Sequence, residues 1–104
     1  MNHIYRDVLS YEIGARIVVE FETRRREIVD YAVVLTVDDN DGSPTTVRVF
    51  DGAHGTNEMH RFDQSGRKSE AEIVHAGTLG EGMRAAIAAV RTGHNEMIDA
   101  WRAT

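Results

Sequence analysis

The residues best suited to proton transfer or metal binding lie close together between positions 47 and 63, in the run VRVFDGAHGTNEMHRFD. Asp51 ends a predicted strand, His54 stands between two glycines, and His60 follows six residues later. Histidine titrates near neutral pH, so two histidines can act as general base and general acid while an aspartate orients one of them. We therefore take Asp51, His54 and His60 as candidate catalytic residues.

Three more residues of this segment are candidates for binding a substrate. Arg48 and Arg61 carry the positive charge that a phosphate contact needs, and Gly55 allows a ligand to approach the main chain closely. Cleavage of RNA by attack of its 2′-hydroxyl needs a base, an acid and a cation beside the charged phosphorane, without a metal. For this reaction we expect no cofactor.

Other interpretations of the same residues stay open. Asp51, His54 and His60 are residue types that bind divalent metals, although two histidines separated by five residues are not a usual zinc spacing. The loop can instead recognise a protein partner or an anion. In the plainest alternative, His54 closes a turn by bonding to Asp51, and His60 only fills an exposed face of a sheet.

The surrounding sequence predicts strands first and helices afterwards. Alternating or β-branched segments indicate four to five strands, at 15–23, 28–37, 45–51, 57–63 and 68–75. The first 14 residues fit either a short strand or a docked arm. The expected fold is therefore α+β, an antiparallel β-meander followed by two C-terminal helices packed on one face.

The helical region begins where the hydrophobic period changes from two to 3.6 residues. Thr78 and Glu81 have the spacing of a capping box, which places the helix start there. Gly93 predicts the end of this first helix, and Asn95 the cap of a second, shorter one.

In the predicted sheet, the strand and the loop decide where the candidate residues point. Asp51 has the same parity as Val47 and Val49, which places it at the end of the core-facing side of its strand. His60 lies on the next strand, so a hairpin would bring it close to His54.

Length and charge narrow the class of protein. The chain has 104 residues, which corresponds to one domain spanning 1–104, and its net charge of −5 argues against a broad basic surface for nucleic acid. It has no cysteine, and therefore no disulfide or thiolate zinc site. It lacks a long apolar run and a signal-peptide pattern at the N-terminus, so we expect a cytoplasmic protein without a membrane partner.

The run VRVFDGAHGTNEMHRFDQSGRK resembles a motif of small uncharacterised bacterial and archaeal proteins, approximately V-R-Y-D-x-A-H-G followed by H-R, D and G. The matching residues are Arg48, Asp51, Ala53, His54, Gly55, His60, Arg61 and Gly66. The same stretch is distantly similar to TumE-type toxins of toxin–antitoxin pairs. The resemblance implies a site around Asp51, His54 and His60, RNA as the target, and a cognate antitoxin protein as partner.

Together these observations give one working hypothesis and two alternatives. The hypothesis is a toxin-like ribonuclease of a bacterial toxin–antitoxin pair, with histidine acid–base catalysis and no metal. The first alternative is a non-enzymatic interaction module, a homodimer joined through a sheet edge or through the C-terminal helices, because a small sheet leaves edges to cover. The second is a small metal-binding protein that uses Asp51, His54 and His60.

Overall fold

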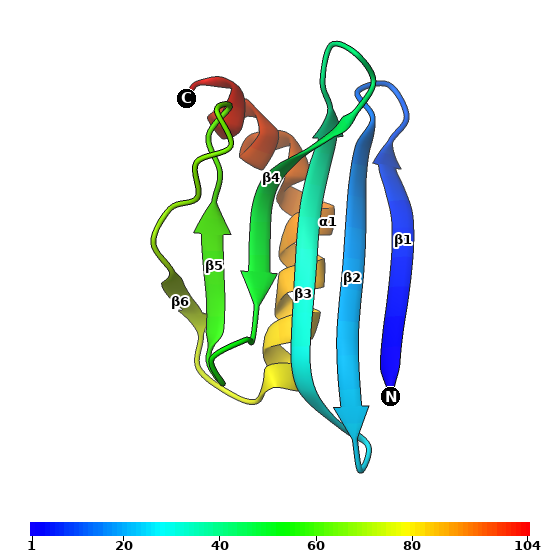
Figure 1. Ribbon diagram of the computed structural model, residues 1–104, viewed down its shortest axis with the longest axis vertical. Coiled ribbons are helices and arrows are strands. Elements are labelled where there is room, and N and C mark those ends of the chain that lie inside the picture. Colours follow the sequence, from blue (N-terminus) through cyan, green and yellow to red (C-terminus); the bar gives the residue numbers. More distant parts are fainter.

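A computed structural model of the chain describes all 104 residues and shows one antiparallel sheet with a long helix against it (Figure 1). The six strands follow chain order across the sheet: β1 (Asn2–Ser10), β2 (Ala15–Arg24), β3 (Glu27–Asp38), β4 (Pro44–Asp51), β5 (Asn57–Arg61) and β6 (Glu72–His75). The helix α1 (Leu79–Arg102) comes last. The α+β class and the meander are confirmed, but the sheet has a sixth strand because the first residues form the edge strand β1 rather than a docked arm.

The C-terminal region forms one continuous helix of 24 residues, not the two helices that the sequence predicts. Gly93 lies inside α1 and does not end it. A glycine inside a helix costs only about 1 kcal/mol relative to alanine. Val90 before it and Met97 and Ile98 after it lie on the same apolar stripe against the sheet. Packing of this continuous stripe therefore outweighs the poor helix preference of Gly93.

A buried amide from β5 fixes the start of α1 to the sheet. Thr78 and Glu81 form the capping box expected from the sequence. The Asn57 side chain lies below this turn, with its Nδ2 3.2 Å from the Thr78 carbonyl oxygen and its Oδ1 accepting a hydrogen bond of 2.8 Å from the Tyr31 hydroxyl. A Cβ atom on Gly82 would overlap the Asn57 amide, so glycine is what allows this close approach.

The two faces of the sheet have different surroundings. In β2 and β3 the odd-numbered residues pack under α1, and Ile17, Val33 and Leu35 are fully buried there. Even-numbered residues such as Val18 and Val34 lie on the opposite side and are half-buried. We call these sides the helix face and the open face. Figure 1 views the molecule from the open face, with α1 behind the sheet.

One irregularity in β4 changes which way its side chains point. Leu35 of β3 pairs with Arg48, and Thr36 pairs with Thr46, so Val47 is an extra residue in β4. Such a bulge shifts the alternation of the strand by one position. The parity that the sequence suggests for the residues after Val47 is therefore reversed.

The end of the sheet beyond β5 is also shorter than expected. The last strand covers only Glu72–His75. Before it, Lys68 makes a single isolated bridge to Phe62, and residues 69–71 belong to no strand.

α1 lacks the apolar stretch that a membrane-crossing helix needs.

Candidate functional site

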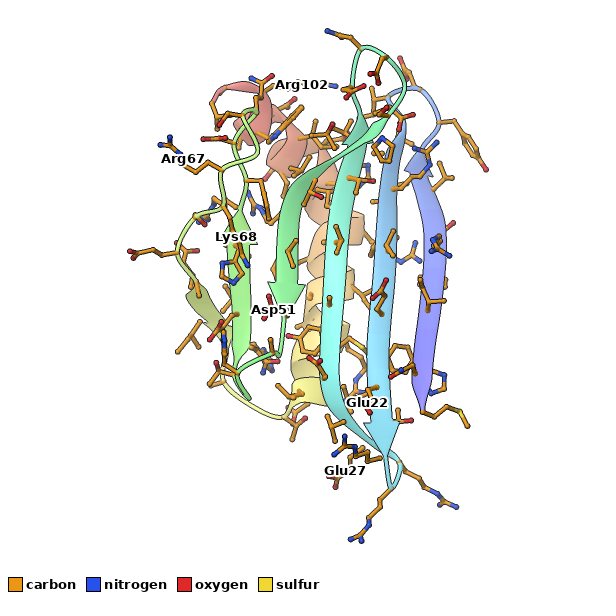
Figure 2. All side chains as sticks on the ribbon, in the orientation of Figure 1. Glu22, Glu27, Asp51, Arg67, Lys68 and Arg102 are labelled. Carbon is orange, nitrogen blue, oxygen red and sulfur yellow. The ribbon has the colours of Figure 1, made fainter.

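The strands β4 and β5 form a hairpin that carries most of the candidate residues. Its register places Asp51 directly opposite Glu58 and Val49 directly opposite His60. Asp51 also pairs with Ala32 of β3, an open-face residue. Asp51, Glu58 and His60 therefore project from the open face, and the prediction that Asp51 ends the core-facing side is wrong because of the bulge before it. Figure 2 shows Asp51 at the end of β4, beside β5.

These three side chains form a compact group, which we call the acid–histidine cluster. One ligand-type atom from each of Asp51, Glu58 and His60 lies within 4.8 Å of the other two. Nε2 of His60 is 3.6 Å from Oδ2 of Asp51. The side chains of His60 and Asp51 are 11% and 14% exposed, and that of Glu58 is 11% exposed. The cluster is thus nearly closed to solvent.

Neighbouring groups hold each member of the cluster in place. The Thr56 hydroxyl donates a hydrogen bond of 2.8 Å to Oε1 of Glu58, and Nδ1 of His54 lies 3.4 Å from Oε2. These two hydrogen bonds, the one from Thr56 first, lower the pKa of Glu58 below its ordinary value. On the other side of the cluster, Nδ1 of His60 is 3.1 Å from the carbonyl oxygen of Ser69.

The cluster lacks the basic partner that paired carboxylates usually have. Neither Asp51 nor Glu58 forms an ion pair with a lysine or arginine; the only side chains that could pair with them at this distance are His60 and His54. Two carboxylates directly opposite each other on neighbouring strands repel. The arrangement therefore favours a bound cation between them.

His54 occupies a different place from the one expected. Its side chain is 77% exposed in the loop after β4, and it contacts Glu58 rather than Asp51. Oδ1 of Asp51 accepts a hydrogen bond from the Ala53 main chain instead. Gly55 closes the same loop, with a φ of 79° and a main-chain hydrogen bond to Gly52. Gly55 thus supports a turn.

The two arginines expected to contact a substrate lie on the opposite side of the sheet. Arg48 pairs with Leu35 of β3 and with Arg61 of β5, so both arginines belong to the helix face. The expectation that they lie beside the histidines must be corrected, because the bulge at Val47 reverses Arg48, and Arg61 follows His60 directly in the alternating strand. The structure brings Asp51 and His60 together but separates them from both arginines.

Glu58 is the member of the cluster that the sequence analysis missed. Two features of the sequence pointed to it. Glu58 is two residues before His60, so a strand places both on one face. Asp51 and Glu58 also flank the glycine-containing loop symmetrically, which is the geometry of a direct cross-strand pair. The sequence spacings typical of zinc sites are defined by histidine pairs, so they did not select Glu58.

A hollow of about 640 Å³ adjoins the cluster at Asp51. Its lining includes Asp51, open-face residues of β2 and β3, and the helix-face residues Phe21 and Tyr31, but no residue of α1. Four carboxylates line it, and no lysine or arginine does: Glu20, Glu22, Asp30 and Asp51. Any molecule that approaches Asp51 from this side meets negative charge, which favours cations over polyphosphates.

Tyr31 links the cluster to the helix face. Burial, and then the negative charge of Asp51, raise the pKa of Tyr31 to about 12. Its hydroxyl donates to Asn57, so the phenol stays protonated and holds the junction between sheet and helix.

Comparison with known proteins finds no matching family model, no matching curated protein and no matching solved structure. The chemistry of the site therefore has to be inferred from its own residues. Two carboxylates and an imidazole can hold a divalent cation. The same groups, with His54 beside Glu58, can also move a proton.

Proposed function

We propose that the protein binds a divalent transition-metal ion through Asp51, Glu58 and His60. The observation that carries this proposal is the direct register pair of two nearly buried carboxylates, Asp51 and Glu58, with His60 against them and no lysine or arginine paired to either. Burying like charges opposite each other is unfavourable unless a cation lies between them. A metal ion would satisfy both carboxylates at once.

The dimensions and the donor types fit such an ion. Bonds of about 2.0–2.2 Å from zinc to imidazole and carboxylate place neighbouring ligand atoms roughly 3–4 Å apart. The separation of 3.6 Å between Nε2 of His60 and Oδ2 of Asp51 lies in this range. The ligand atoms of all three residues lie within 4.8 Å of one another, so small side-chain rotations would bring them to the distances that a metal ion needs. Imidazole with carboxylates suits zinc, manganese or ferrous iron. Three protein ligands leave a coordination position for water.

The contact between His60 and Ser69 supports the same conclusion. A carbonyl oxygen only accepts hydrogen bonds, so Nδ1 of His60, 3.1 Å from it, carries the hydrogen in the neutral ring. Nε2 then presents a lone pair toward Oδ2 of Asp51. Histidines that bind metals usually donate their second N–H to a carbonyl or carboxylate in this way. Without a cation or a proton, two acceptors would face each other.

Metal titration of single variants tests the proposal. Chelator-treated wild-type protein is titrated with Mn²⁺ and with Zn²⁺ by isothermal calorimetry, and we expect one ion per chain. His60→Ala should abolish this binding. His94→Ala is the matched control, because His94 lies on α1 with its Nδ1 near the Arg91 carbonyl, and it should bind like the wild type. Wild-type protein that binds neither ion, or variants that bind equally, would contradict the proposal.

A second candidate function, RNA cleavage by histidine acid–base catalysis in a toxin-like protein, is favoured by one observation. His54 contacts Glu58 from the solvent side, and His60 approaches the same carboxylate from within the sheet. A proton can pass between two histidines that share one acid. If this is the function, purified protein cleaves RNA in the presence of a chelator and His54→Ala does not. Cleavage that requires added metal would instead combine the two candidates, and intact RNA would remove the second.

A further inference from the structure

A small cavity lies on the helix face, under the last turns of α1. Its volume is about 50 Å³. The polar part of its lining comes from Arg48 of β4, Arg61 of β5, Trp101 of α1, and Thr104 just after the helix. Apolar side chains complete the wall: Val47, Phe62, Met97 and Ala100. The cavity shares no lining residue with the acid–histidine cluster.

Two hydrogen-bond donors in this lining have no partner. Nε of Arg48 and Nε1 of Trp101 are both buried and unpaired. Buried donors in proteins are almost always satisfied by the protein, by water or by an ion. Both residues line the same small cavity, so an acceptor bound in it is the simplest partner for the two N–H groups.

The positive charge of Arg48 has no direct ion-pair partner. Arg48 forms no ion pair and stands directly opposite Arg61, so two guanidinium groups face each other across the hairpin. Arg61 is paired with Glu72 at 2.8 Å, outside the cavity. Burial, followed by the charge of Arg61, lowers the pKa of Arg48 from its ordinary value, and the charge of Glu72 offsets this only in part. A negative group beside Arg48 would relieve both the lost hydration and the repulsion.

We propose that this cavity binds a small oxyanion of the phosphate type, held by the Arg48 guanidinium and the Trp101 indole N–H. A guanidinium presents N–H groups in a planar fork that matches two oxygens of a phosphate. A volume of about 50 Å³ accommodates an ion of this size, or the terminal phosphate of a larger molecule that reaches in from solvent. Arg61 is close enough across the hairpin to add its charge.

The tryptophan is a convenient reporter, because the chain has only one. The protein is labelled with nitrogen-15 and kept with a chelator, so that phosphate cannot act through a metal at Asp51. Sodium phosphate then replaces sodium chloride at constant ionic strength, and the indole N–H resonance is followed. We expect a saturable shift of this resonance. A shift that does not saturate, or that chloride alone produces, would overturn the proposal.

Two variants identify the residues involved. Arg48→Met keeps the apolar stem but removes the charge and the Nε donor, and it should weaken phosphate binding by about tenfold or more. Arg67→Met removes the same charge from an exposed position outside the cavity and should bind phosphate like the wild type. Equal affinities in the two variants would contradict the proposal. A circular dichroism spectrum shows that each variant is folded.

A third titration distinguishes the chemistry of the anion. Sodium acetate offers a carboxylate, and phosphomonoesters such as a nucleoside monophosphate offer a phosphate on a larger body. Stronger binding of phosphate than of acetate supports the oxyanion assigned here. A stronger response to acetate would overturn it. Tighter binding of the phosphomonoester than of free phosphate would show that the source is a larger phosphorylated ligand.

Discussion

The two faces of the β4–β5 hairpin carry like-charge pairs of opposite sign. On the open face, Asp51 stands opposite Glu58, and on the helix face Arg48 stands opposite Arg61. Only two register positions separate these pairs along the hairpin. Like charges directly opposite each other are unfavourable in a sheet. An ion of opposite charge would relieve the repulsion in each pair: a cation beside the acids and an anion beside the arginines.

The difference shows how strongly the pleat of a strand sorts side chains. In the sequence, acids, histidines and arginines form one cluster of the kind that an active site for phosphate chemistry needs. In the sheet, alternation sends the acids and His60 to one side and the arginines to the other. A single substrate phosphate cannot touch His60 and Arg48 from the same side. The hairpin therefore carries two separate charged groups, one on each face of the sheet.

The largest effect is expected on stability, from a substitution at the close contact between α1 and the sheet. In Gly82→Ala the new methyl group would overlap the Asn57 amide, which also holds the helix start. Overpacking of a rigid site together with loss of a buried hydrogen-bonded junction should lower the free energy of unfolding by roughly 3 kcal/mol. Urea unfolding followed by circular dichroism measures this.

The neighbouring glycine supplies the control. A Cβ atom on Gly80 would lie no closer than 3.5 Å to its nearest contact, in the side chain of Ile28. Gly80→Ala should therefore gain the better helix preference of alanine, up to about 1 kcal/mol. If both variants lost stability equally, the close approach at Gly82 would not be what fixes the helix.

The second prediction separates two possible sets of metal ligands on the open face. Glu58→Gln removes a carboxylate of the cluster but keeps its shape, and metal affinity should fall about a hundredfold or more. His54→Ala removes only an exposed side chain that touches Glu58 and should change the affinity by much less. Isothermal titration of both variants gives the comparison. The reverse order of effects would favour the ligand set Asp51, His54 and His60.

Much of the fold followed from local patterns, and the errors came from packing that the patterns do not record. The strands could be predicted because their β-branched and alternating residues repeat over whole segments. The helix start could be predicted because Thr78 and Glu81 act locally. Gly93 was misleading, since its cost is small compared with the apolar stripe on both sides of it. Single-residue preferences do not measure that sum.

The candidate site shows the same limit at the level of one residue. Asp51 and His60 could be selected from their types and spacing. The side on which Asp51 lies depends on the extra residue Val47, and nothing in the local sequence marks a bulge there. The spacing of Glu58 from His60 placed both on one face, but only the register shows that Glu58 lies directly opposite Asp51. A shift of one residue in a strand moves every following side chain to the other face.

A third prediction uses Tyr31 to detect the charge of Asp51 through the sheet. Because the pKa of Tyr31 is raised to about 12, the phenol of the folded protein ionises later than in the unfolded chain, whose tyrosine pKa is near 10.0. Stability should therefore fall as the pH rises between these two values. In Asp51→Asn the charge is lost but the burial remains. The pKa of Tyr31 should decrease only partly, and phenolate absorbance measures it.

The outcome distinguishes the two causes of the raised pKa. Burial is the larger of the two causes. The substitution Asp51→Asn should therefore lower the pKa of Tyr31 by less than half of the difference between its folded and unfolded values. A bound cation at Asp51 should have the same sign of effect as the substitution, since it also cancels the negative charge. Metal that leaves the titration of Tyr31 unchanged would place the ion elsewhere.

The smallest expected effect concerns the acid side of the cluster in the metal-free protein. The hydrogen bond from Thr56 and that from His54 lower the pKa of Glu58, so its carboxylate is more acidic in the folded than in the unfolded chain. A lowered pKa contributes stability above the unfolded value, and this contribution disappears as the pH falls through the folded value. Between neutral pH and about pH 3, wild-type protein should lose more stability than Glu58→Gln, which has no carboxylate to protonate there. Urea unfolding at a series of pH values compares the two slopes. Equal slopes would mean that the two hydrogen bonds do not favour the charged form of Glu58. The open face would then offer weaker support for a bound cation than the arginine pair on the helix face offers for a bound anion.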